Sequence, residues 1–183
     1  DTFFCPDGAV AVAIDNDGIA HVTFGITRVG HFEIGDTYTA YPFYDGLGYW
    51  REGMPPFEDG DMNLNALDPE LLEENVNLIG WTQDLNGNGT WDVIGTVESL
   101  GNYRTGISTH PTMAIDENNY IYVVYSSVAE TFQTDDQNYR HLFARTSKDG
   151  GATWGDEFSD LTGDIVTGFS ECIHPALAAN TDE

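Results

Sequence analysis

The sequence predicts an all-β fold built from antiparallel four-stranded units. Glycine is abundant, with 20 residues, and patterns of helical periodicity are scarce. Two segments that begin at Ala13 and Ala114, 101 residues apart, align without a gap. Each reads as a strand, a turn rich in Asp, Asn or Gly, and a second strand, which is the pattern of a β-hairpin. Residues 147–154 form a third signal, because their sequence is typical of a tight turn between strands.

Length and composition are those of a folded globular chain. The 183 residues are 40% hydrophobic and 13% aromatic, enough to build a core and too apolar for general disorder. We treat residues 1–183 as a single partial domain with three units. Residues 8–99 form one unit with an insertion, residues 100–169 form a second, and residues 170–183 begin a third.

The charge is strongly negative: six Lys and Arg residues stand against 31 Asp and Glu residues, for a net charge of −25. A chain of this charge is repelled by nucleic acid and by anionic membrane surfaces, so neither is an expected partner. No apolar stretch is long enough to insert into a membrane as a helix. The acidity suits salty or calcium-rich surroundings, which favours a secreted or cell-surface location.

The two cysteines leave two alternatives open. Cys5 and Cys172 could form one disulfide in an exported protein, or remain free as small core residues. The chain starts at Asp1 with neither an initiator Met nor a signal peptide, so we expect a processed or excised chain.

The expected strands follow the repeats. In the first unit, residues 19–27, 38–44 and 77–83 are expected to be extended. Residues 68–74 form a short inserted helix, with Asp68 as its N-cap. The second unit has strands at residues 110–116, 120–126, 139–146 and 165–169. Its 147–154 turn joins the third strand to the fourth.

Four strands in about 64 residues match one blade of a β-propeller. The pair His110-Pro111 recurs as His174-Pro175, 64 residues later, which marks the beginning of a third blade. Two blades and part of a third cannot close a ring, since propellers need roughly four to eight. We therefore expect the partner of this chain to be the remainder of its own propeller, or a surface assembly.

Residues 147–154 have five positions of a self-locking turn: Ser147, Asp149, Gly151, Thr153 and Trp154. The Ser and Asp oxygens can accept hydrogen bonds from backbone amides of the loop. The adjacent glycines permit positive φ, and the Trp side chain can fill a gap between neighbouring sheets. The run resembles the Asp-box of sialidase-like (BNR repeat) β-propellers, where it has a structural role away from the catalytic face.

Residues 84–92 are candidate calcium ligands. Oxygen-bearing side chains stand at loop positions 1, 3, 5 and 9, and a Gly at position 6, as in the first part of an EF-hand or dockerin-type loop. The candidate ligands are Asp84, Asn86, Asn88, the Thr90 carbonyl and Asp92. The pattern departs at position 12, where Gly95 replaces the bidentate Glu. The alternative is a plain β-turn built on two Asn-Gly dipeptides.

Neither zinc chemistry nor a catalytic set can be recognised in the sequence. The histidines lack metal-ligand spacing and are expected to be structural. Sialidases clamp a substrate carboxylate with three arginines, for which the planar guanidinium is well suited. None of the five arginines lies in the family's Arg-Ile-Pro-type motif, and Arg140 and Arg145 are expected at the surface.

Residues 49–55 and 80–88, with the hairpin repeats, resemble large secreted proteins of Bacteroidota-type bacteria. These carry sialidase-like propellers ahead of a sorting domain for type IX secretion. The resemblance implies an exported or surface location and no particular substrate. Our leading hypothesis is a non-enzymatic, calcium-stabilised binding or scaffold module with a glycan or protein ligand. The alternatives are a sialidase-like glycoside hydrolase and a structural component of a larger surface assembly.

Overall fold

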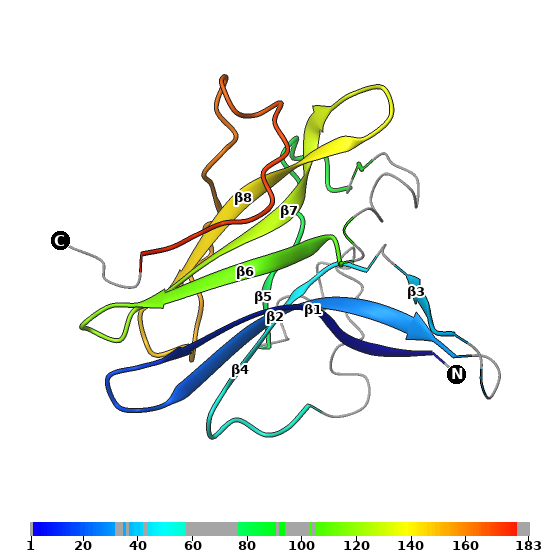
Figure 1. Ribbon diagram of the computed structural model, residues 1–183. Helices are drawn as coiled ribbons and strands as arrows, with labels where there is room; N and C mark the ends of the chain where they lie inside the picture. Colours follow the sequence, from blue (N-terminus) through cyan, green and yellow to red (C-terminus); the bar gives the residue numbers. More distant parts are fainter. Residues whose placement is uncertain are drawn as a thin grey trace.

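The computed structural model describes residues 2–31, 35, 37–41, 44–57, 77–90, 92–93, 103 and 105–178. Over this part the chain forms two antiparallel sheets and no α-helix, which confirms the all-β class (Figure 1). Nor does this part hold a helix that is long and apolar enough to cross a membrane. The helix predicted at residues 68–74 lies outside the described residues.

The first sheet has the order β1-β2-β4-β5. Its strands are β1 (Thr2–Ile14), β2 (Ala20–Gly30), β4 (Leu47–Arg51) and β5 (Leu78–Gly80). The short β3 (Thr39–Tyr41) pairs with the far end of β2. The outer strand predicted at residues 77–83 is thus present in shorter form as β5.

The second sheet has the order β6-β7-β8-β9. Its strands are β6 (Ser108–Ile115), β7 (Ile121–Gln133), β8 (Asn138–Ser147) and β9 (Ser159–Asp160). The first three correspond to predicted strands, and β7 is longer than predicted.

The fourth strand predicted at residues 165–169 is wrong. These residues form turns, and the edge strand is β9 instead. The Asp164 carboxylate accepts hydrogen bonds from the Val166 and Thr167 amides, at 2.6 and 3.0 Å. This side chain bends the backbone into a turn, although the residues that follow it are apolar.

The hairpin repeat is confirmed in register. Ala13 pairs with His21 in the first hairpin, and Ala114 pairs with Tyr122 in the second. Each first strand also carries one irregularity, at residues 6–10 in β1 and 109–112 in β6. The two hairpins are therefore the same structural unit.

The two hairpin turns touch each other. The Asn16 side-chain amide donates to the Asp116 carbonyl and to Asn119 Oδ1, at 2.9 and 2.8 Å. The Asn119 amide in turn donates to Asp17 Oδ2 at 2.9 Å. Farther along, the Asp7 carboxylate accepts from the Thr109 hydroxyl at 2.6 Å. These contacts hold β1 beside β6 (Figure 1).

The two sheets pack face to face, and unlike faces of the two sheets are in contact. We name as the back face of each sheet the one that carries Val12 and Ile14 in the first sheet and their equivalents Met113 and Ile115 in the second. The front face is the opposite one. Met113 and Ile115 pack into the main core, which contains Tyr49 from the first sheet. Because Tyr49 lies on the front face of the first sheet, the back face of the second sheet covers that front face.

The back face of the first sheet is only partly covered. A smaller core around Phe24, Ile26 and Leu78 covers its middle. At the β1 edge, Val12 and Ile14 are 62% and 69% exposed, although Met113 and Ile115 are packed. Within the described residues, this edge of the first sheet thus lacks the neighbour that the second sheet has.

Residues 171–178 run along the second sheet and beside β6 (Figure 1). The Cys172 amide donates to the Arg140 carbonyl at 2.9 Å, and the Ser126 hydroxyl donates to the Cys172 carbonyl at 3.1 Å. The rings of His110 and His174, the two repeat-equivalent histidines, lie 4.6 Å apart. Residues 171–178 themselves form no regular strand.

Candidate functional site

The loop at residues 147–154 is held by its own side chains, as predicted. The Ser147 hydroxyl accepts a hydrogen bond from the Gly151 amide at 2.9 Å. The Asp149 carboxylate accepts from the Thr153 amide at 2.8 Å and from the Thr153 hydroxyl at 2.5 Å. These donors hold the pKa of Asp149 below its ordinary value, although burial acts in the opposite direction. The φ angles of Gly150 and Gly151 are 66° and 81°.

The indole of Trp154 fills a gap between the sheets. Its ring meets the ring of Tyr49 edge-on, with centroids 5.1 Å apart. Tyr49 is fully buried on the first sheet, and its hydroxyl lies 2.7 Å from Nδ1 of His21. Gly151 also approaches Tyr49 so closely that a Cβ atom there would overlap the Tyr49 hydroxyl. The loop therefore docks the second sheet onto the first.

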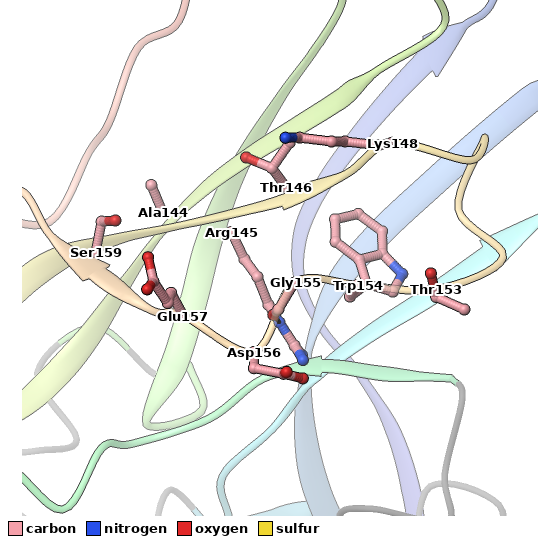
Figure 2. Close-up of a pocket in the computed structure, with 10 residues that line it drawn as sticks. All are labelled: Ala144, Arg145, Thr146, Lys148, Thr153, Trp154, Gly155, Asp156, Glu157 and Ser159. Atoms are coloured by element: carbon pink, nitrogen blue, oxygen red, sulfur yellow. Dashed lines mark hydrogen bonds between the residues drawn. The ribbon is translucent and has the colours of Figure 1, made fainter.

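An open pocket lies beside this loop, between the end of β8 and the chain that follows the turn (Figure 2). Its lining includes Arg145, Lys148, Asp156 and Glu157. Figure 2 shows the Arg145 side chain extending past Gly155 toward β5. The guanidinium donates to the carbonyls of Gly155 and Ile79, at 2.7 and 3.1 Å.

The hydrogen bonds of Arg145 therefore stabilise the fold. The Arg145 side chain also stacks on Phe158 and Trp81, with distances of 4.5 and 5.1 Å from Cζ to the ring centroids. Burial lowers the pKa of its guanidinium. A side chain used in this way is poorly placed to clamp a substrate carboxylate.

The predicted surface position of Arg140 is wrong. The side chain is 2% exposed and donates to the carbonyls of Ile107 and Gly106, at 2.6 and 3.1 Å. Both acceptors precede β6, so this arginine satisfies backbone oxygens that the strand ladder does not reach. Arg28 is likewise bonded to the hydroxyls of Tyr44 and Thr2.

The candidate ligands in residues 84–92 form a compact polar loop. Asp84 accepts hydrogen bonds from the Gly87 and Gly89 amides, both at 2.7 Å. The Asn88 side-chain amide donates to Asp92 Oδ2 at 2.7 Å, and the Thr90 hydroxyl lies 3.3 Å from Asp92 Oδ1. The hydrogen bond from Asn88 helps to hold the pKa of Asp92 below its ordinary value. The structure therefore brings the predicted ligands together.

One acidic residue that the sequence did not predict joins this loop. Glu130 lies on β7, is 0% exposed, and accepts a hydrogen bond from the Asn86 side-chain amide through Oε1. Its Oε2 is buried without a hydrogen-bond partner. Burial and the Asp84 carboxylate raise the pKa of Glu130, an effect only partly offset by the nearby backbone amides of Leu85 and Asp92. The signal available in the sequence was an acidic residue that directly follows Val128 and Ala129, which are buried.

The described residues contain no group of three or more His, Cys, Asp or Glu side chains that could hold a metal by themselves. The carboxylates at this loop are separated by the carboxamides of Asn86 and Asn88. A metal here would need amide and backbone oxygens as ligands in addition to carboxylates. Such a mixed oxygen set suits calcium.

His21 and His141 have hydrogen bonds that fit the predicted structural role. His21 bonds Tyr49, and its Nε2 lies 3.2 Å from Asp15 Oδ2. His141 lies between Asp160 Oδ2, at 2.7 Å, and the Gly168 carbonyl, at 2.8 Å. Burial lowers the pKa of His110, and the neighbouring His174 adds to this effect.

The cysteines are not paired. Cys5 on β1 and Cys172 near β8 are both free thiols, so of the two alternatives the structure has the reduced one. Burial, with a contribution from the Asp7 carboxylate, raises the pKa of the Cys5 thiol. A raised pKa makes this thiol a weaker nucleophile at neutral pH.

Comparison with known proteins assigns no family. No family model matches the sequence, and no curated protein matches it with significant similarity.

Proposed function

We propose that the chain is a segment of a β-propeller and serves as a non-enzymatic scaffold or binding module of a secreted or cell-surface protein. The observation that carries the proposal is the stacking of two equivalent sheets, with the back face of one on the front face of the other. The self-bonded loop at residues 147–154 and its Trp154, which lie at this junction, add support.

The sense of the stacking is compatible with a ring. When unlike faces of a repeated unit meet, the same operation can be applied again, and it gives a closed ring if the rotation closes and an open stack if it does not. Repeating it places a further unit on the exposed back face of β1, next to Val12 and Ile14. In the other direction it places a unit on the front face of the second sheet. Residues 171–178, which bond Ser126 on that face, begin to cover it.

A scaffold role fits the side chains better than hydrolysis does. Arg28, Arg140 and Arg145 donate to protein oxygens and do not converge. A sialidase-like site would therefore need other arginines. The strongly acidic composition favours exposure to salty or calcium-rich surroundings outside the cell. A glycan or a protein is the kind of ligand that such a surface module would bind.

The exposed β1 edge provides the structural test. In the full-length protein, Val12→Lys should destabilise the fold by about 3 kcal/mol or more, because a neighbouring unit would bury the lysine. The control Glu117→Lys, at an exposed turn, should stay within about 0.5 kcal/mol of the parent. Chemical denaturation measures both. A Val12→Lys protein as stable as the control would refute a neighbouring unit at this face.

The absence of catalysis is tested separately. Incubation of the full-length protein with a fluorogenic sialoside should release no fluorophore. Turnover that is lost on substitution of clustered arginines would replace the scaffold proposal with a hydrolase.

A further inference from the structure

Glu130 is the least expected side chain in the second sheet. It follows the buried residues Val128 and Ala129 on β7, and it is itself 0% exposed. A carboxylate removed from water is costly unless something compensates its charge. Its Oε1 accepts from the neutral carboxamide of Asn86, and the backbone amides of Leu85 and Asp92 lie nearby, but its Oε2 has no hydrogen-bond partner. The fold therefore keeps a buried carboxylate that its own hydrogen bonds satisfy only in part.

The surroundings of Glu130 add further negative charge. Asp92 Oδ2 lies 3.5 Å from the same Asn86 nitrogen that contacts Glu130. Asp84 is close enough to act on Glu130 electrostatically. Within the described residues, the two acid–base pairs at salt-bridge distance are His21 with Asp15 and His141 with Asp160. No described Lys or Arg forms such a pair with Asp84, Asp92 or Glu130.

From this geometry we infer that residues 84–92 and Glu130 together form a calcium site, in which Glu130 replaces the ligand that the loop lacks at its twelfth position. The loop contributes the Asp84 and Asp92 carboxylates, the Asn86 and Asn88 side-chain oxygens and the Thr90 carbonyl. Glu130 contributes one or both carboxylate oxygens, which brings the set to the six to eight oxygen ligands that calcium takes.

Ion binding requires the loop to rearrange. The side-chain nitrogens of Asn86 and Asn88 now point at Asp92, and that of Asn86 also points at Glu130. Rotation of each carboxamide by about 180° would put Oδ1 where Nδ2 now lies. It would also break the hydrogen bonds that the two Oδ1 atoms accept from the backbone amides of Asn88 and Thr90, so the loop backbone has to adjust as well. Each contact between an amide and a carboxylate would then become a pair of oxygens facing a cation.

The site would join the two sheets. Residues 84–92 follow β5, the outer strand of the first sheet, whereas Glu130 belongs to β7 of the second. The nearby bond between the hydroxyls of Thr82 and Ser127, at 3.2 Å, shows that these segments already meet. An ion bound here would stabilise the sheet-to-sheet packing, because the ligands come together only when both sheets are folded.

The test measures calcium binding by the full-length protein. Isothermal titration with CaCl2 in moderate KCl should show saturable binding, and Glu130→Gln should weaken it on the order of tenfold or more. The matched control is Asp135→Asn, which removes one charge from an exposed position at the β7–β8 turn. The control should bind calcium as the parent does.

Melting curves separate a ligand from a merely structural glutamate. Without calcium, Glu130→Gln should be at least as stable as the parent, because a buried amide costs less than a buried unpaired carboxylate. On addition of CaCl2 the parent should gain stability and the variant should gain far less. Three results would overturn the site: no saturable binding by the parent, undiminished binding by Glu130→Gln, or equal weakening by Asp135→Asn. This test uses no residue of the exposed β1 edge, so it is independent of the propeller proposal.

Discussion

Gly151 combines two constraints that can be measured apart. Its φ of 81° is unfavourable for a residue with a side chain, and a Cβ atom would overlap Tyr49. Its neighbour Gly150 has a similar φ of 66° but open space around the Cβ position. Gly150→Ala should therefore cost about 1 kcal/mol from backbone strain alone.

Gly151→Ala should cost about 2 kcal/mol more than Gly150→Ala, because it also displaces Tyr49 from the core between the sheets. Urea denaturation of both variants gives the comparison. Equal losses of stability in the two variants would mean that the close approach of Gly151 to Tyr49 does not contribute to stability.

His141 should make stability depend on pH. Burial disfavours its charged form, but the Asp160 carboxylate and the Gly168 carbonyl outweigh burial and raise its pKa above 6.5. A raised folded-state pKa contributes stability that is fully present below about pH 6.5. This contribution is lost as the pH rises through the folded-state pKa.

The variant Asp160→Asn isolates this contribution from that of His110, whose lowered pKa acts in the opposite direction. The parent should exceed Asp160→Asn in unfolding free energy by more at about pH 5.5 than at about pH 8.5. Denaturation at both pH values measures the difference. A gap that is constant or grows with pH would contradict the assigned role of Asp160.

The contacts of some single residues could be predicted from the sequence, and those of others could not. Ser147 and Asp149 accept hydrogen bonds from backbone amides of their own loop, so the local sequence was enough to predict these bonds. Glu130 lies 44 residues from Asn86, and nothing in the sequence indicates that the two meet. Arg140 was predicted at the surface because it flanks a strand, but distant carbonyl groups provide its partners.

At the scale of elements, the paired hairpin turns offer a test of coupling. The Asn16 backbone and side-chain amides both donate to Asn119 Oδ1, across the two repeats. Asn119 has a φ of 62°, so Asn119→Gly keeps the backbone and removes only the side chain. In a double-mutant cycle with Asn16→Ala, we expect a coupling of about 1 kcal/mol. Strictly additive losses would show that the turns touch without stabilising each other.

The edge strands were the elements that the sequence predicted least well. The run from Ile165 to Phe169 is apolar enough to suggest a strand, yet Ile165 is 97% exposed. The side chain of Asp164 decides the local structure there, and hydrogen bonds to β8 place the edge at Ser159 and Asp160 instead. Local turn chemistry prevailed over hydrophobicity because the run packs on little else.

For the whole molecule, the repeat predicted the hairpins but not how they would stack. The aligned segments show that two units are equivalent, and either like or unlike faces could then have met. Which faces meet depends on side chains such as Tyr49 and Trp154, which are in contact between the two sheets. Only the folded arrangement reveals that Val12 is exposed where its equivalent Met113 is packed.

The net charge of −25 should make the whole molecule sensitive to salt. Like charges destabilise a compact state, and screening shortens their range from about 10 Å at 0.1 M ionic strength to about 3 Å at 1 M. The unfolding midpoint should therefore rise with NaCl, by a similar amount in the parent and in Glu130→Gln. Calcium added at constant ionic strength should give a further rise that saturates and is largely absent from Glu130→Gln. Thermal unfolding followed by circular dichroism can resolve the two effects. A midpoint unaffected by NaCl would mean that the acidic side chains are too well solvated to repel one another, and that the charge does not limit stability.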